Sequence, residues 1–147
     1  MGAYADKALN YRLVGYSCSQ AIAMAFSDLI DALDENELSR LASPFGGGFA
    51  KQASLCGCVS GMGIVWGFLF GKDDPRLKVD IYRESAVLSD AFKEKYGSID
   101  CRDIWTEYPG NDAKPLPEGY KKMHCSEYVK GAAELLEQYL NDKGIIG

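Results

Sequence analysis

Apolar residues recur along this chain at helical spacing, and no stretch alternates apolar and polar residues for more than a few positions. Capping boxes mark two helix starts, at Ser17 with Gln20 and at Asp34 with Glu37. The apolar stripes are Ala5, Leu9 and Leu13, then Leu77, Ile81, Leu88, Phe92 and Tyr96, and finally Val129, Ala132, Ala133, Leu136 and Leu140. The pattern predicts an all-α fold, a single helical bundle of about five to seven helices over residues 1–147.

Residues 52–71 carry no charge, and by length they could cross a membrane. Their hydrophobicity is reduced by glycines, and the other helices are amphipathic and need a core to face. We therefore predict a Gly-rich, buried central helix rather than a membrane span. Glycines four residues apart, at 57 and 61 and at 63, 67 and 71, let neighbouring helices approach closely.

Composition and charge limit the classes of binding partner that the protein is expected to have. The chain has 147 residues, of which 47% are apolar, and a net charge of -5 from 16 basic and 21 acidic residues. This balance argues against a nucleic-acid or anionic-membrane partner, because either would favour a basic face. The first residues show no basic segment followed by an apolar run, so we expect a cytoplasmic protein. The redox partner and a homo-oligomeric state are left open.

The five cysteines carry the candidate chemistry. In a reducing compartment they are expected to be metal ligands or redox thiols rather than structural disulfides. Four lie near predicted helix starts: Cys18 after Ser17, Cys56 after Ser54, Cys101 after Asp100, and Cys125 at the opening of the last stripe. A helix N-terminus favours a thiolate by about 0.3–1 kcal/mol, which lowers a thiol pKa by less than about one unit.

Cys58 is expected to differ from these four. It follows Cys56 by two residues, which is about 200° around a helix, so it should point away from the site and pack in the core. A local disulfide between Cys56 and Cys58 stays open if the segment forms a turn instead.

Three hypotheses follow for Cys18, Cys56, Cys101 and Cys125. If their sulfurs converge they cannot all be thiolates, because each pair 4 Å apart repels by about 4 kcal/mol at a dielectric of 20. In the first hypothesis the protein is a thiol-based oxidoreductase, in which Cys18 or Cys56 attacks and Cys101 or Cys125 resolves. In the second, all four bind a [2Fe–2S] cluster or Zn²⁺ for electron transfer or structure. In the third, they pack in a non-catalytic helical interaction module.

The cysteine contexts resemble the redox-active protein family designated C_GCAxxG_C_C. The first cysteine of the family pattern lies in Cys18-Ser19-Gln20-Ala21, and the Gly-rich stretch that follows is Phe45-Gly46-Gly47-Gly48. The central motif is Cys56-Gly57-Cys58-Val59-Ser60-Gly61. The third and fourth cysteines of the pattern are Cys101 and Cys125. Cys58 departs from the pattern, since it stands at the motif's Ala. The resemblance covers residues 11–140 and implies redox-active cysteines, without a defined substrate.

Several other features have plainer interpretations. We expect Gly46-Gly47-Gly48 to be a flexible connector, since it lacks a nucleotide-binding pattern. His124 is the only histidine and adjoins Cys125, but a surface position is expected. The proline-rich stretch 106–119 is either a cover for the site or plain surface, and Trp66 and Trp105 are expected in the core.

Overall fold

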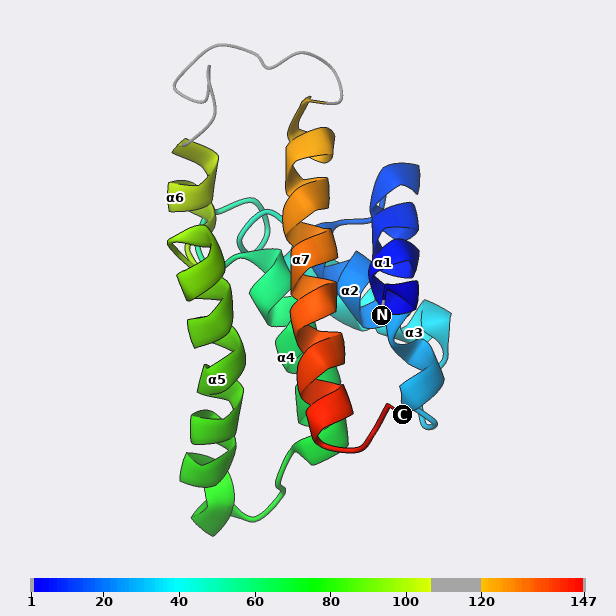
Figure 1. Ribbon diagram of the computed structural model, residues 1–147, viewed down its shortest axis with the longest axis vertical. Helices are drawn as coiled ribbons and strands as arrows, with labels where there is room; N and C mark the ends of the chain where they lie inside the picture. Colours follow the sequence, from blue (N-terminus) through cyan, green and yellow to red (C-terminus); the bar gives the residue numbers. More distant parts are fainter. Residues whose placement is uncertain (1, 107–119, 147) are drawn as a thin grey trace.

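The computed structural model describes residues 2–106 and 120–146, with the side chains of 105, 106 and 120–124 left aside. The predictions for Trp105, His124 and the stretch 107–119 therefore lie outside the described residues. The described chain forms the α-helices α1 (Ala3–Val14), α2 (Cys18–Ala25), α3 (Glu35–Ala42), α4 (Gly57–Phe70), α5 (Lys78–Tyr96), α6 (Cys101–Thr106) and α7 (Tyr120–Asp142). Short 3₁₀ helices span Ser27–Leu29, Ser43–Phe45 and Pro75–Leu77. The predicted all-α fold is confirmed (Figure 1).

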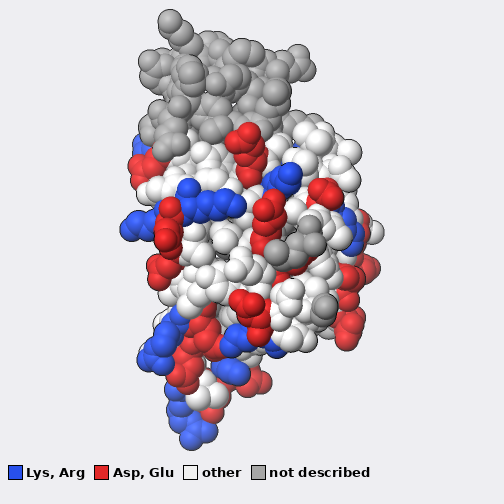
Figure 2. Space-filling view, viewed as in Figure 1, with Lys and Arg blue, Asp and Glu red and all other residues white. Residues whose placement is uncertain are grey.

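The helices pack around α4 and α7. Helix α7 contacts α1, α2, α4 and α5, while α4 contacts α2, α5 and α7. In Figure 1, α5 and α1 flank α7 on opposite sides, and α4 lies behind it. Acidic and basic side chains are interspersed over the face in Figure 2.

Both predicted capping boxes are present. The Ser17 hydroxyl accepts a hydrogen bond from the Gln20 amide, and the Gln20 side chain accepts one from the Ser17 amide. Asp34 and Glu37 make the same reciprocal pair at 2.7 and 3.0 Å. These bonds satisfy amide groups that have no partner inside the helix, so they fix where α2 and α3 begin.

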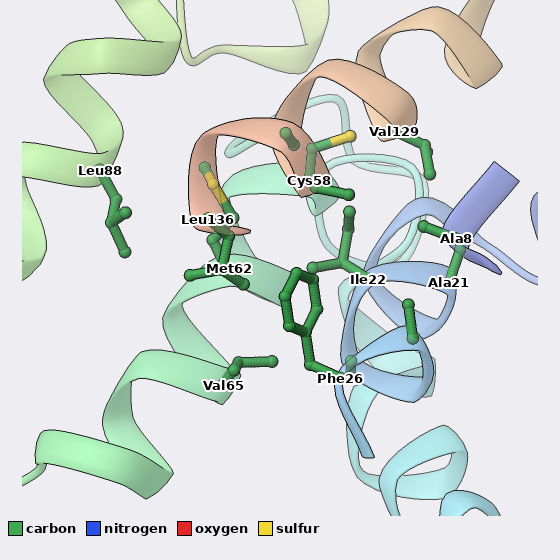
Figure 3. Packing of buried hydrophobic residues seen from close by; sticks show 14 of the residues in the cluster. Ala8, Ala21, Ile22, Phe26, Cys58, Met62, Val65, Leu88, Val129 and Leu136 are labelled. Atoms are coloured by element: carbon green, nitrogen blue, oxygen red, sulfur yellow. The ribbon is translucent and has the colours of Figure 1, made fainter. Parts of the chain in front are cut away.

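The core is built mainly from α2, α4 and α7, as Figure 3 shows. Ile22 and Phe26 of α2 meet Met62 of α4 and Leu136 of α7, and all four side chains are fully buried. Tyr4 stacks on Phe26 with ring centroids 4.5 Å apart, which fastens α1 to this core. The central position of α2 and α4 determines where their first residues, including three cysteines, are held.

The stripe predicted for the first helix is wrong in part. Ala5 and Ala8 of α1 are buried, whereas Leu13 is 47% exposed. Helix α1 packs against both α7 and α2, and small alanine side chains allow that close packing. The buried face was therefore selected by how closely the helices approach, rather than by the largest apolar residues.

The uncharged stretch also differs from its prediction. Helix α4 begins only at Gly57, and one of its faces is exposed at Gly63, Gly67 and Phe68. Gly57 and Gly61 lie against α2, but a side chain at Gly63 or Gly67 would meet nothing within 4 Å. The close-packing prediction therefore holds for the first glycine pair and fails for the second. Nowhere in the described chain is a helix both long and apolar enough to span a bilayer.

Candidate functional site

One cavity of about 460 Å³ is lined by all five cysteines. It lies where α2, α4 and α6 begin, with the second turn of α7 as a further wall. Cys18 comes from α2, Cys56 and Cys58 from the start of α4, Cys101 from α6 and Cys125 from α7. The structure thus brings together the four cysteines singled out in the sequence and adds Cys58 to them.

Close packing of α2 on α4 positions Cys18 against the first turn of α4. A β-carbon added to Gly57 would lie 3.3 Å from the β-carbon of Cys18, and one added to Gly61 would lie 2.8 Å from that of Ile22. Cys18 therefore packs on the glycine that separates Cys56 from Cys58. A larger residue in place of either glycine would push the two helices apart.

A short antiparallel contact joins Cys56 to Cys101. The Cys56 amide donates to the Ile99 carbonyl at 2.8 Å, and the Cys101 amide donates to the Ser54 carbonyl at 2.6 Å. Between them, Leu55 and Asp100 form an isolated antiparallel bridge. These bonds hold the starts of α4 and α6 side by side, although 45 positions separate the two cysteines in the sequence.

The Gly-rich segment is an ordered wall of the cavity rather than the flexible connector we expected. Residues 47–51 and Ala53 have φ between 50° and 72°, the left-handed region. Backbone bonds hold the turn, including those from the Ala53 amide to Gly47 and from the Ser54 amide to Gly48. A β-carbon at Gly48 would lie 2.7 Å from that of Cys101, so glycine is required for this approach.

Cys58 is fully buried, as predicted, but it faces the cavity instead of pointing away from it. Its side chain is hydrogen-bonded to those of Cys18 and Cys56. Those bonds, and then burial and the neighbouring thiol charges, raise the pKa of Cys58 well above its ordinary value. Figure 3 shows Cys58 at the edge of the core beside Ile22.

The error for Cys58 has a local cause. Cys56 is the N-cap of α4, with φ -57° and ψ 131°, so it lies outside the helical turn. The 200° rotation between residues i and i+2 applies only when both are helical. The sequence signal that could have revealed this is the glycine at position 57, which allows the first turn of α4 to press against α2.

Cys125 does not open its helix, in contrast to the prediction. Helix α7 begins at Tyr120, five residues earlier, so Cys125 lies in its second turn. The field of the helix terminus is largely confined to the first turn, and Cys125 gains little from it. Cys18 and Cys101 are the first residues of α2 and α6, and Cys56 caps α4, so those three placements stand.

Within its described residues, the structure does not show the four-cysteine metal site of the second hypothesis. Among the side chains that the structure describes, no group of three or more His, Cys, Asp or Glu residues is placed to hold a metal ion. A [2Fe–2S] or Zn²⁺ site would need four thiolates directed at a common centre.

Together the fold and the cavity define a helical thiol protein, in which distant cysteines meet in one pocket. A family model described as "Putative redox-active protein (C_GCAxxG_C_C)" matches residues 16–139, and the chain belongs to that family. No match was found among curated proteins, and none among solved structures.

Proposed function

We propose that the protein performs thiol–disulfide exchange in this cavity, with Cys18 as the attacking thiolate and Cys58 as the resolving thiol. The observation that carries the proposal is that Cys18 and Cys58 line one cavity, with the β-carbon of Cys18 packed on Gly57, the residue next to Cys58. Two thiols that share a cavity in this way can form a disulfide after side-chain movements. The membership of a redox-active family supports the same chemistry.

Cys18 is suited to attack because it combines access with a favourable electrostatic position. It is half-buried and lines the cavity, whereas Cys58 is fully buried. As the first residue of α2, it lies at a helix N-terminus that favours negative charge. The protonated Cys58 can donate its hydrogen bond to the Cys18 sulfur and so stabilise a thiolate there.

The raised pKa of Cys58 supports a mechanism in which Cys18 reacts first and Cys58 reacts second. Before attack, Cys58 keeps its proton because its neighbours hold it in the neutral form. Once Cys18 is part of a mixed disulfide, its negative charge is gone, and so is one cause of the raised pKa. Cys58 can then ionise and attack the Cys18 sulfur.

Each step conserves bonds and electrons. The Cys18 thiolate attacks a substrate disulfide, forms a mixed disulfide and expels one substrate thiolate. The Cys58 proton passes to solvent, and its thiolate then attacks the Cys18 sulfur and expels the second substrate thiolate. The protein gains a disulfide between Cys18 and Cys58 while the substrate disulfide is reduced by two electrons, and the reverse sequence oxidises a dithiol.

Cys56, Cys101 and Cys125 are proposed to continue the exchange. Cys56 is also hydrogen-bonded to Cys58, and the other two cysteines line the same cavity. Attack by one of these thiolates on the first disulfide would move the bond without any further oxidant. A redox partner that cannot enter the cavity could then be reached from its rim.

Stopped-flow reaction of the native protein with the neutral disulfide 4,4'-dithiodipyridine tests the assignment. The expected result is a fast phase that is lost in Cys18→Ser and retained in the control Cys125→Ser. In Cys58→Ser the fast phase should end in a mixed disulfide on Cys18, visible by intact mass spectrometry. An unchanged fast phase in Cys18→Ser, or thiols that react only after unfolding, would reject the proposal, and the second result would favour an interaction module.

A further inference from the structure

The charge of the described part of the cavity lining is opposite in sign to that of the chain. Arg12 and Lys51 line the cavity, and among the described residues that line it there is no aspartate or glutamate. The whole protein has 21 acidic residues against 16 basic ones. The described lining of this thiol cavity, with two cations and no carboxylate, therefore differs from the acidic composition of the whole chain.

Arg12 has an unsatisfied hydrogen-bond donor at this site. Its Nη1 donates to the Tyr16 carbonyl at 3.0 Å, but its Nε is buried without a hydrogen-bond partner. Within the described part of the chain, no carboxylate lies close enough to Arg12 or Lys51 for an ion pair. A buried donor without a partner costs about 1–3 kcal/mol, so a ligand that satisfied it would gain from that contact.

The remaining lining suits a small organic molecule. The volume of about 460 Å³ falls within the range typical of ligand pockets, about 300–1,000 Å³. Ile104 and Tyr128 provide apolar wall. Arginine presents a planar set of donors that matches the oxygens of a carboxylate or phosphate.

We infer that the substrate of this cavity is a small anionic disulfide or thiol, whose carboxylate or phosphate binds Arg12, with Lys51 at the rim, while its sulfur meets Cys18. The inference rests on the proposed function, since it names the substrate class of the same site. The alternative is that the two cations only stabilise cysteine thiolates.

An anionic and a neutral disulfide probe distinguish substrate recognition from thiolate stabilisation. The dianion 5,5'-dithiobis(2-nitrobenzoate) carries a carboxylate on each ring, whereas 4,4'-dithiodipyridine is neutral at pH 8. Second-order rates with both probes would be measured for the native protein, Arg12→Gln, Arg12→Lys and Lys51→Gln. Arg83→Gln, which removes a positive charge from an exposed position on α5 outside the cavity, is the matched control.

We expect Arg12→Gln to lower the rate with the anionic probe by about tenfold, the effect of losing one charged hydrogen bond. Its rate with the neutral probe should fall far less than its rate with the anionic probe, and a native far-UV circular dichroism spectrum would show that the variant is folded. Arg12→Lys should recover part of the lost rate, Lys51→Gln should show a smaller loss, and Arg83→Gln should show none. Added salt should slow the anionic probe in the native protein more than in Arg12→Gln.

Two outcomes would overturn the inference. If Arg12→Gln slowed both probes equally, the guanidinium would act on the thiolate rather than on the substrate. If neither rate changed, Arg12 would have no part in recognition. A different result would reject the proposed function itself: the neutral probe would react equally fast with the native protein and with Cys18→Ser.

Discussion

The β-carbon of Cys18 packs on the backbone of Gly57, where the first residue of α2 meets the first residue of α4. A β-carbon at Gly57 would be 3.3 Å from that of Cys18 and 3.1 Å from the Phe45 carbonyl oxygen. The contact places Cys18 against the glycine that separates Cys56 from Cys58 in the sequence. The redox chemistry proposed for this protein therefore depends on a packing interaction.

Gly61→Ala should weaken both the fold and the thiol reaction. The added methyl would lie 2.8 Å from the Ile22 β-carbon and 3.0 Å from the Ser19 carbonyl, so α2 and α4 must separate. We expect a loss of about 1–3 kcal/mol in the free energy of unfolding, together with slower reaction of Cys18. Urea denaturation and the stopped-flow assay measure the two effects.

Gly63→Ala is the control on the same helix. A side chain there would meet nothing within 4 Å. Because alanine favours a helix over glycine by up to about 1 kcal/mol, this variant should be as stable as the native protein or more so, with an unchanged thiol reaction. Equal destabilisation by the two substitutions would contradict the role given to helix packing.

The buried thiol of Cys58 predicts how stability depends on pH. Hydrogen bonds to Cys18 and Cys56 raise the pKa of Cys58 well above the ordinary 9.0. Above pH 9 the unfolded chain therefore releases this proton while the folded chain keeps it. The stabilisation is complete below pH 9 and is lost as pH rises toward the folded-state pKa, by up to about 1.4 kcal/mol per pH unit.

Urea denaturation between pH 9 and 10 would measure this loss. The pKa values of Tyr4, Tyr11 and Tyr96 are raised to about 12 from 10.0, so their own contribution to the loss of stability sets in as pH approaches 10.0, at the upper end of the window. In Cys58→Ala the decline with pH should be shallower, because one shifted proton is absent. Identical slopes for the native protein and the variant would show that Cys58 titrates normally.

Glu137 should anchor the start of α1. Its side chain is 4% exposed, and its Oε2 accepts a hydrogen bond from the Gly2 amide at 3.2 Å. Gly2, the N-cap of α1, has no side chain that could cap the helix, so the Glu137 carboxylate of α7 takes the place of a local cap. Glu137→Ala should lower the free energy of unfolding by about 1–3 kcal/mol, and Glu137→Gln by less.

Thermal or urea denaturation of Glu134→Ala provides the comparison for Glu137. Glu134 lies one turn earlier on α7 and is exposed, so its loss should change stability little. If both alanine variants were equally stable, the contact between α7 and the start of α1 would have no energetic importance.

Relief of left-handed backbone strain should stabilise the wall of the cavity. Ala50 has φ 50°, which costs about 1–2 kcal/mol for a residue with a β-carbon. Ala50→Gly should therefore raise the free energy of unfolding by up to about 1 kcal/mol after its greater chain entropy is subtracted. The same change in the middle of α5, Ala91→Gly, should lower it by about 1 kcal/mol. A loss in both variants would argue against the strain.

Short-range sequence signals identified much of the fold. The capping residues Ser17 and Asp34 fixed two helix starts, and Gly97 ended α5 with φ 88°, because these effects act within a few residues. The cysteine spacing and the glycines around it were enough to suggest the family. The start of α4 could not be read in this way, because backbone hydrogen bonds with Ile99 and Cys101 keep residues 54–56 out of the helix.

The amino-acid sequence by itself determined that the chain is helical, and it identified Cys18, Cys56, Cys101 and Cys125 as the candidate redox residues. Only the tertiary structure decided that Cys58 joins them, that Cys125 lies away from a helix end, and that Arg12 and Lys51 share their cavity. Helix propensity and capping depend on neighbours along the chain. The surroundings of a thiol depend on which helix faces approach, and that is set by contacts between residues far apart in the sequence.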